Sequence, residues 1–177
     1  MSKYRRVWFD RAAVFFTVNC EKRGAGGLLI KNIGALRTAF QMVKKDRPFT
    51  IDAIVVLPDH IHCVWTLPDD DNDYSSRWRL IKGNFSRMLP AVNESLSPSR
   101  AKRSERAVWQ RRFWEHHIRD ERDYRNHIDY IHYNPVKHGY CEYARDWQSS
   151  SFHNFVKAGV YPLDWYQDTT PLKKTGE

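Results

Sequence analysis

The chain has 177 residues, with 29 Lys or Arg against 21 Asp or Glu, which gives a formal net charge of +8 and a pI of about 9.5. This length supports one domain with a hydrophobic core and argues against two. No run approaches the roughly 18 apolar residues of a membrane-spanning helix, and the N-terminus lacks the apolar segment of a signal peptide. These two features predict a cytoplasmic protein. The positive charge favours a phosphate-rich partner such as nucleic acid, with a membrane surface as the competing explanation.

The first third of the chain predicts a strand, a helix and a pair of strands. Residues 14–19 form a short run of β-branched and aromatic residues that is typical of a strand. Residues 32–45 place apolar side chains at steps of three and four, which is the pattern of an amphipathic helix. The runs 51–57 and 60–67 are separated by a Pro-Asp turn and therefore predict an antiparallel pair.

A basic helix and a basic loop are expected next. Ser75 or Ser76 is a candidate N-cap for a helix that ends near Leu89. Residues 90–107 are rich in Ser, Arg and Lys and show no apolar periodicity, so they predict a mobile basic loop.

The last third predicts a fourth strand over residues 113–118, a helix over 120–132 and an irregular C-terminal wrap over 140–177. Large aromatic residues are the expected anchors of this wrap: Trp147, Phe152, Phe155 and Trp165. The order of elements indicates an α+β fold of the ferredoxin-like, split βαβ type. We expect one domain, residues 1–177, in which an antiparallel sheet carries its helices on one face.

His60 and His62 open the second strand of the predicted pair. Residues i and i+2 of a strand point to the same face, so the two imidazoles are expected side by side, roughly 7 Å apart at Cα. Neighbouring imidazoles can form half of a divalent-metal site. The same spacing also occurs in ordinary buried or surface histidines, and spacing alone does not decide between the two interpretations.

Tyr130 and Asn134 lie four residues apart on the predicted helix and are therefore neighbours on one face. At ~100° per residue they fall beside the apolar stripe that should pack on the sheet, whereas Tyr133 falls opposite it. We therefore select Tyr130 as the candidate nucleophile and expect Tyr124 and Tyr140 to be structural. A Tyr and an Asn at this spacing are also common as packing and capping residues, so the hypothesis depends on the combination.

Four segments carry a resemblance to a known family. They are Phe15-Phe16-Thr17-Val18-Asn19, the run from Val55 to His62, Phe113-Trp114-Glu115-His116, and Asp129-Tyr130-Ile131-His132-Tyr133-Asn134-Pro135-Val136-Lys137-His138-Gly139. Together they span nearly the whole chain, and the last is the most specific. In these segments the chain resembles the REP-associated tyrosine transposases, which are single-tyrosine HUH endonucleases; Ile61 is the hydrophobic residue between the two histidines.

This resemblance implies roles for individual residues. The metal ligands would be His60, His62 and Asn134, and Tyr130 would attack DNA. Related insertion-sequence transposases usually carry Gln where this chain has Asn134, whose reach is shorter, so a bridging water or His127 is an alternative to Asn134. The implied ion is Mg²⁺ or Mn²⁺, and a donor set with two imidazoles favours Mn²⁺ in vitro.

The resemblance also implies a substrate: single-stranded DNA with palindromic REP hairpins, which the enzyme nicks and rejoins through a 5′-phosphotyrosine. We expect a monomer, because the short span from Phe113 to Tyr130 is compatible with a site built within one chain. Basic and aromatic residues that could read flanking bases or hold stem phosphates are the candidate DNA contacts: Tyr4, Arg5, Arg6, Lys44, Lys45, Arg77, Arg79, Lys82, Arg111 and Arg112.

Three alternatives remain open at this point. A non-catalytic protein that binds DNA or RNA hairpins would keep the basic surface without the chemistry. A metal-dependent hydrolase would use water in place of Tyr130. A structural zinc module is disfavoured, because Cys20, Cys63 and Cys141 are widely spaced and form no Cys-x-x-Cys pair.

Overall fold

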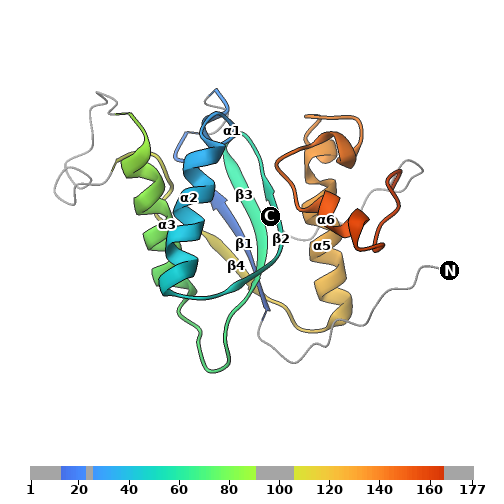
Figure 1. Cartoon of the computed structure of the whole chain (residues 1–177), viewed down its shortest axis with the longest axis horizontal. Helices are drawn as coiled ribbons and strands as arrows, with labels where there is room; N and C mark the ends of the chain where they lie inside the picture. Colours follow the sequence, from blue (N-terminus) through green and yellow to red (C-terminus); the bar gives the residue numbers. More distant parts are fainter. Residues whose placement is uncertain (1–12, 23–25, 91–105, 166–177) are drawn as a thin grey trace.

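One antiparallel sheet of four strands forms the centre of the computed structural model, which describes residues 13–22, 26–90 and 106–165. The strands are β1 (Ala13–Asn19), β2 (Thr50–Val56), β3 (His60–Thr66) and β4 (Trp114–His117), in the spatial order β2-β3-β1-β4 (Figure 1). The helical elements are α1 (Leu28–Lys31), α2 (Ile33–Asp46), α3 (Tyr74–Met88), α5 (Glu121–Lys137), the 3₁₀ turn η1 (Ala144–Asp146) and α6 (Phe152–Lys157). The α+β class and the antiparallel sheet expected from the sequence are confirmed.

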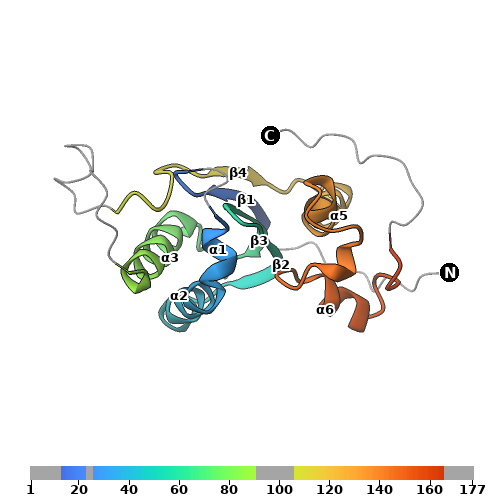
Figure 2. The same cartoon turned by 90° about the horizontal axis from the view of Figure 1, so that it is seen from above.

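Helices cover both faces of the sheet, which corrects the expectation that they lie on one face. Along β1, Phe16 and its neighbours of the same parity pack under α2 and α3, whereas Phe15 packs under α5. Figure 2 shows α2 and α3 on one side of the strands and α5 with α6 on the other. The physical reason lies in β1 itself, since residues of both parities are apolar and neither side tolerates exposure to water.

Aromatic side chains fill the core between the sheet and the α2–α3 pair. Trp65 of β3 stacks on Trp78 of α3, with ring centroids 4.3 Å apart and planes 17° from parallel. Phe16 and Phe49 contact Trp65 at 4.9 and 4.2 Å. Large rings bury more area than aliphatic side chains do, so this cluster anchors α3 on the sheet.

Helix α5 is longer than expected from the sequence. It begins after Asp120, whose carboxylate accepts a hydrogen bond from the amide of Asp123 at 2.8 Å, and it continues through Pro135 to Lys137. A proline removes one amide donor, a loss that matters less in the last turn than in a helix interior. Gly139, with φ of 69°, then ends the helix in a left-handed conformation.

The start of α3 also differs from the expectation. The cap is Asp73, not Ser75 or Ser76, because its carboxylate accepts the hydrogen bond from the amide of Ser76 at 3.0 Å. A carboxylate at this position also complements the positive end of the helix dipole.

The segment that follows α5 packs along the edge strand β2. The indole of Trp147 donates to the carbonyl of Val56 at 2.9 Å, and the amide of Val56 donates to the carbonyl of Ser149 at 2.8 Å. Phe152, at the start of α6, is fully buried. These contacts cover an edge that would otherwise present open backbone groups. No helix among the described residues is long and apolar enough to cross a membrane.

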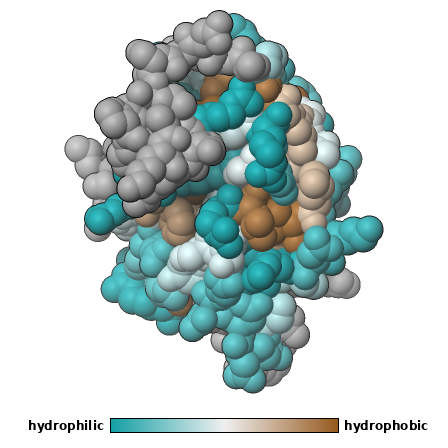
Figure 3. All heavy atoms as spheres, turned by 90° about the vertical axis from the view of Figure 1, so that its left-hand side faces the viewer, coloured by the Kyte–Doolittle hydropathy of each residue, from teal (hydrophilic) through white to brown (hydrophobic). Residues whose placement is uncertain are grey.

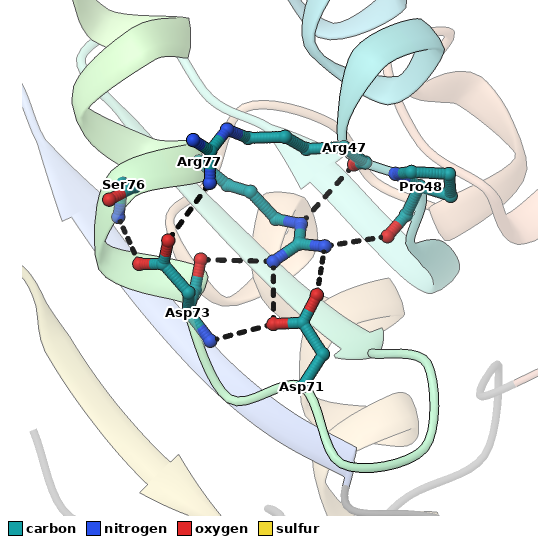
Figure 4. Close-up of polar contacts among 6 residues, drawn as sticks. All are labelled: Arg47, Pro48, Asp71, Asp73, Ser76 and Arg77. Carbon is teal, nitrogen blue, oxygen red and sulfur yellow. Dashed lines mark hydrogen bonds and ion pairs between the residues drawn. The ribbon is translucent and has the colours of Figure 1, made fainter.

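Arg77 is a structural residue, and its predicted role as a DNA contact is wrong. Its side chain is 2% exposed, and its guanidinium donates to both carboxylate oxygens of Asp71, at 3.0 and 2.6 Å (Figure 4). It also donates to the backbone carbonyls of Arg47, Pro48 and Asp73, at 3.2, 2.9 and 3.0 Å. The hydrogen bond from Arg77 lowers the pKa of Asp71 to about 2. Arg77 thereby fastens the end of α2 to the loop before α3.

The Arg77→Ala variant is expected to lower the free energy of unfolding by on the order of 3 kcal/mol, because it leaves three backbone carbonyls and a carboxylate without their donor. Urea denaturation measures this directly. Arg79→Ala is the matched control, since Arg79 lies two residues away on the same helix and is exposed. Similar unfolding midpoints for the two variants would contradict the structural role of Arg77.

Candidate active site

His60 and His62 project from β3 toward α5, and each ring is oriented by a hydrogen bond at Nδ1. His60 Nδ1 donates to the carboxylate of Asp59 at 2.6 Å, and His62 Nδ1 lies 2.9 Å from the hydroxyl of Thr17 on β1. The two ring centroids are 4.9 Å apart, and His62 is 3% exposed. Since Nδ1 is engaged in both rings, Nε2 is the nitrogen by which each would bind a metal.

Tyr130 lies directly against this histidine pair. Its ring centroid is 5.3 Å from that of His62 and 6.1 Å from that of Phe15, and the residue is 7% exposed. The apolar stripe of α5, which includes Tyr124 and Ile131, packs on the sheet and sets the rotation of the helix. Tyr133 is outside this packing cluster and partly exposed. The structure thus brings together the tyrosine and the histidine that were selected from the sequence.

Asn134, one turn after Tyr130, is fully buried, and neither its amide oxygen nor its amide nitrogen has a hydrogen-bond partner among the described residues. A buried amide without partners costs about 1–3 kcal/mol. Such an arrangement is expected where the oxygen serves a ligand, and an amide oxygen completes a donor set with two imidazoles. The residues therefore fit a divalent metal.

Two further residues at the C-terminal end of α5 were missed by sequence reasoning. Lys137 Nζ donates to the Tyr130 hydroxyl at 3.4 Å and lies 4.9 Å from the centre of its ring. The ring of His138 is 5.4 Å from that of His60. Lys137 is seven residues from Tyr130, which is two turns of helix and hence the same face, but the helix was expected to end before it.

His127 belongs to a different cluster from the histidine pair, so the structure does not support it as a substitute for Asn134. Its Nδ1 donates to the carbonyl of Asp123 at 2.8 Å, and its ring stacks on His116 at 4.8 Å. Among the described residues, the one group of three or more His, Cys, Asp or Glu side chains that could converge on a metal consists of His116, Asp123 and His127.

Hydrogen bonds within this cluster join the edge strand β4 to the start of α5. The Asp123 carboxylate accepts from His116 Nε2 at 2.8 Å and from the amide of Arg119 at 3.0 Å. Burial raises the pKa of Asp123, but these donors outweigh it and hold the pKa below its usual value. Burial lowers the pKa of His127, which favours the neutral ring. The cluster holds the helix that carries Tyr130 in place.

Three of the predicted DNA contacts on α2 and α3 are exposed but lie across the sheet from the histidine pair. Lys44, Lys45 and Arg79 belong to the helices that cover the opposite face. The side of the molecule formed by α3 is largely hydrophilic, with smaller apolar areas (Figure 3). The structure does not bring these three residues together with Tyr130.

Lys82 differs from Arg111 and Arg112 in its exposure to solvent, because Lys82 is partly buried and the two arginines are exposed. Lys82 Nζ donates to the carbonyls of Gln110 and Arg111, at 2.9 and 3.4 Å, and burial lowers its pKa to about 8. It therefore ties α3 to the segment before β4, which corrects its expected role as a phosphate contact. The side chains of Arg111 and Arg112 are exposed beside β4. Tyr4, Arg5 and Arg6 lie outside the described residues.

Comparison with known proteins agrees with this geometry. Residues 2–134 match the family model described as "Transposase IS200 like". The chain belongs to the IS200-like transposase family. It is 48% identical to the REP-associated tyrosine transposase of Escherichia coli over 96% of this chain and 94% of that protein, and 46% identical to a putative REP-associated tyrosine transposase of Haemophilus influenzae over 93% of each.

A solved structure extends the likeness to three dimensions. The structure of a REP-associated tyrosine transposase bound to a REP hairpin is 46% identical and superposes with a TM-score of 0.77, covering 100% of this chain and 98% of that one. This IS200-like transposase is therefore an enzyme of DNA nicking and transposition.

Replacing Asp123 by Asn should lower the free energy of unfolding by about 1–3 kcal/mol at neutral pH, because the clamp between β4 and α5 loses its charged acceptor. Since the folded pKa of Asp123 is below its ordinary value of 3.8, its stabilising effect is present above that value and is lost as pH falls through the folded pKa.

The measurement is urea unfolding of both proteins from pH 7 down to pH 3, where the difference between them should shrink. Asp146→Asn is the control, because the Asp146 side chain is 51% exposed and outside the clamp. A difference that stays constant down to pH 3 would contradict the assigned role of the carboxylate.

Proposed function

We propose that this transposase nicks and rejoins single-stranded DNA beside a palindromic REP hairpin, with Tyr130 as its nucleophile. The observation that carries the proposal is the contact of Tyr130 with His62, at 5.3 Å between ring centroids, in a site that also buries the unpartnered amide of Asn134. A tyrosine against a donor set of this kind is the arrangement that metal-assisted transfer of a phosphodiester requires.

The reaction conserves the energy of the broken bond. The Tyr130 hydroxyl gives up its proton, and its oxygen forms a bond to phosphorus as the bond from phosphorus to the 3′ oxygen breaks. The departing 3′ oxygen takes up a proton, which leaves a 5′-phosphotyrosine and a free 3′-OH. Attack by a 3′-OH on the phosphotyrosine reverses the step and releases Tyr130. Rejoining therefore needs no ATP, because the phosphodiester is exchanged and not hydrolysed.

Lys137 supports the nucleophile in this scheme. Its ammonium, 3.4 Å from the Tyr130 hydroxyl, favours negative charge on that oxygen as the proton leaves. The exposed stem of Lys137 keeps this cation accessible to a phosphate as well. Asp59 and Thr17 orient the two imidazoles, and Phe15 supplies the apolar wall behind Tyr130.

His60, His62 and Asn134 are the residues that would hold a divalent ion. When bound, Mg²⁺ or Mn²⁺ supplies Lewis-acid polarisation of the scissile phosphate. Two imidazoles and one amide oxygen favour Mn²⁺ over Mg²⁺ in a direct comparison, because nitrogen donors suit the softer ion.

The substrate part of the proposal is supported by the relative whose structure is named as bound to a REP hairpin. The excess of basic residues suits a single-stranded or hairpin DNA partner, and Arg111 and Arg112 are exposed in the segment that precedes the edge strand β4. We further propose that the chain acts as a monomer, with its single domain spanning residues 1–177, and in the bacterial cytoplasm, where chromosomal DNA lies.

A cleavage assay tests the function. With a labelled REP hairpin carrying unpaired extensions, wild-type protein in Mn²⁺ or Mg²⁺ should release a free 3′-OH fragment and form a protein-linked 5′ fragment, both of which EDTA prevents. Tyr130→Phe should abolish the adduct, because it lacks the attacking oxygen. Asn134→Ala should need more metal to reach the same rate, because it removes one proposed ligand.

Tyr133→Phe is the matched control and should form the adduct normally. Cleavage without an adduct that survives in Tyr130→Phe would indicate a hydrolase that uses water. Tight hairpin binding with no cleavage in any metal would indicate a non-catalytic hairpin-binding protein.

Lys137→Met is expected to slow nicking about tenfold, because it keeps the bulk of the side chain but removes the charge beside the Tyr130 oxygen. Lys137→Arg should recover part of the rate. Single-turnover kinetics at saturating protein isolates this step from DNA binding. Equal single-turnover rates for Lys137→Met and the wild type would show that the cation has no part in the reaction.

A further inference from the structure

Two exposed aromatic side chains lie on opposite sides of the candidate active site. Among the large hydrophobic residues that are exposed in the described part of the chain, Trp114 and Tyr140 are the two aromatic ones, at 42% and 43%. The other three are Met42, Met88 and Leu163. Single exposed apolar residues are common on protein surfaces. Aromatic rings are also the side chains on which unpaired bases stack, so the positions of these two rings relative to Tyr130 and His62 are informative.

Trp114 is on β4, and the strand β1 lies between it and the histidine pair on β3. It begins the edge strand β4, directly opposite Thr17 of β1, whose hydroxyl forms the hydrogen bond to His62. Its indole meets the ring of Phe15 edge-on, with centroids 5.7 Å apart, and Phe15 in turn contacts Tyr130 at 6.1 Å. Trp114 therefore lies on the same face of the sheet as the nucleophile.

The indole is held on a rigid support. It is parallel to the ring of His116 within 5°, at a centroid distance of 6.0 Å. His116 is fixed by its 2.8 Å hydrogen bond to Asp123 and by stacking on His127. Because its contact with His116 already restricts the Trp114 ring, the ring loses little conformational entropy when a second flat group stacks on it.

Tyr140 lies on the His60 side of the site, where it follows the C-terminal end of α5. It stacks on His138 at 5.9 Å, and His138 contacts His60 at 5.4 Å. Trp147 lies against Tyr140 at 5.5 Å. Tyr140 was expected to be structural; these contacts anchor its ring, which remains exposed.

We infer that Trp114 and Tyr140 are stacking platforms for unpaired nucleobases on the two sides of the scissile phosphate. Ring contacts run from Trp114 through Phe15 to His62 and from His60 through His138 to Tyr140, so the reacting centre lies between the two platforms. This inference rests on the proposed function and adds to it how the single strand is held.

Unpaired DNA bases fit these platforms better than an apolar protein surface does. Each platform is a single flat ring with an exposed basic residue close to it in the sequence: Arg112 is two residues before Trp114, and Lys137 is three residues before Tyr140. Interleaved rings and cations match the alternating bases and phosphates of a single strand, and stacking accepts any base because each has a π-face. Sequence reading then falls to other residues.

Abasic scanning of the DNA tests the inference. The probe is a fluorescent REP hairpin with unpaired extensions on both sides, in which one nucleotide at a time is replaced by an abasic site. Binding is measured by anisotropy with the full chain carrying Tyr130→Phe, in EDTA, so that neither cleavage nor metal affects the result. Trp114→Ala and Tyr140→Ala are made in this background, with Trp114→Phe and Tyr140→Phe as variants that keep a ring.

For each platform, one abasic position should weaken binding about tenfold with the parent protein and have little effect with the matching Ala variant, because the stacking partner is already gone. The two positions should lie on opposite sides of the cleaved phosphate. The Phe variants should restore most of the affinity. Met42→Ala, which removes an exposed side chain on α2, should bind like the parent.

Two failures are distinguishable. If the hairpin binds the parent tightly but abasic substitutions act equally in the parent and the Ala variants, the stacking inference is wrong and the proposed function stands. If the hairpin does not bind the parent at all, the proposed function fails and the inference falls with it.

Discussion

The packing of α5 on one face of the sheet, chiefly over β2 and β3, is the constraint on which the rest of the structure depends. Phe15 and Val64 on the sheet meet Tyr124, Ile128 and Ile131 on the helix in one buried cluster. This contact sets the rotation of α5 and its distance from the strands. The rotation of a helix determines which of its side chains face the sheet. Tyr130 contacts His62 because the apolar stripe next to Tyr130 on α5 is buried against the sheet.

Several interactions outside this buried cluster help to hold α5 and the sheet in place. The Asp123 clamp joins the start of α5 to β4, and the segment around Trp147 hydrogen-bonds to β2. On the opposite face, Arg77 and the stacked Trp65–Trp78 pair hold α3 in place. A nucleophile that must approach phosphorus in line needs such support, because small displacements reduce the rate steeply.

The basic residues of this transposase divide into two groups that composition does not separate. Arg77 and Lys82 serve the fold, since their cations are bound to carbonyls or carboxylates. Arg79 lies between them on the same helix and is exposed. Net charge therefore indicates the class of partner, whereas burial decides which cations can meet it.

Much of the candidate active site could be predicted from the sequence, because the spacing of its residues within each element is local. Two histidines at i and i+2 of a strand, and a Tyr and an Asn at i and i+4 of a helix, have relative positions that the backbone repeat dictates. The positions of the four strands and of α2, α3 and α5 were likewise predictable, to within a few residues, from apolar periodicity. The short helices α1 and α6 were not predicted, and α6 lies in the segment that was expected to be irregular. The full length of α5 was not predictable, because a proline late in a helix is tolerated according to what packs around it, and Lys137 was missed as a result.

What the tertiary structure alone decided are the relations between elements distant in the chain. The sequence determined that a strand carries the histidine pair and that a helix carries Tyr130, since both follow from repeat geometry and side-chain polarity. Only the folded chain decided that α5 covers the face opposite α2 and α3, that His127 joins His116 and not His60, and that Trp114 and Tyr140 border one site. These outcomes depend on which apolar surfaces bury one another, a choice made by the whole chain at once.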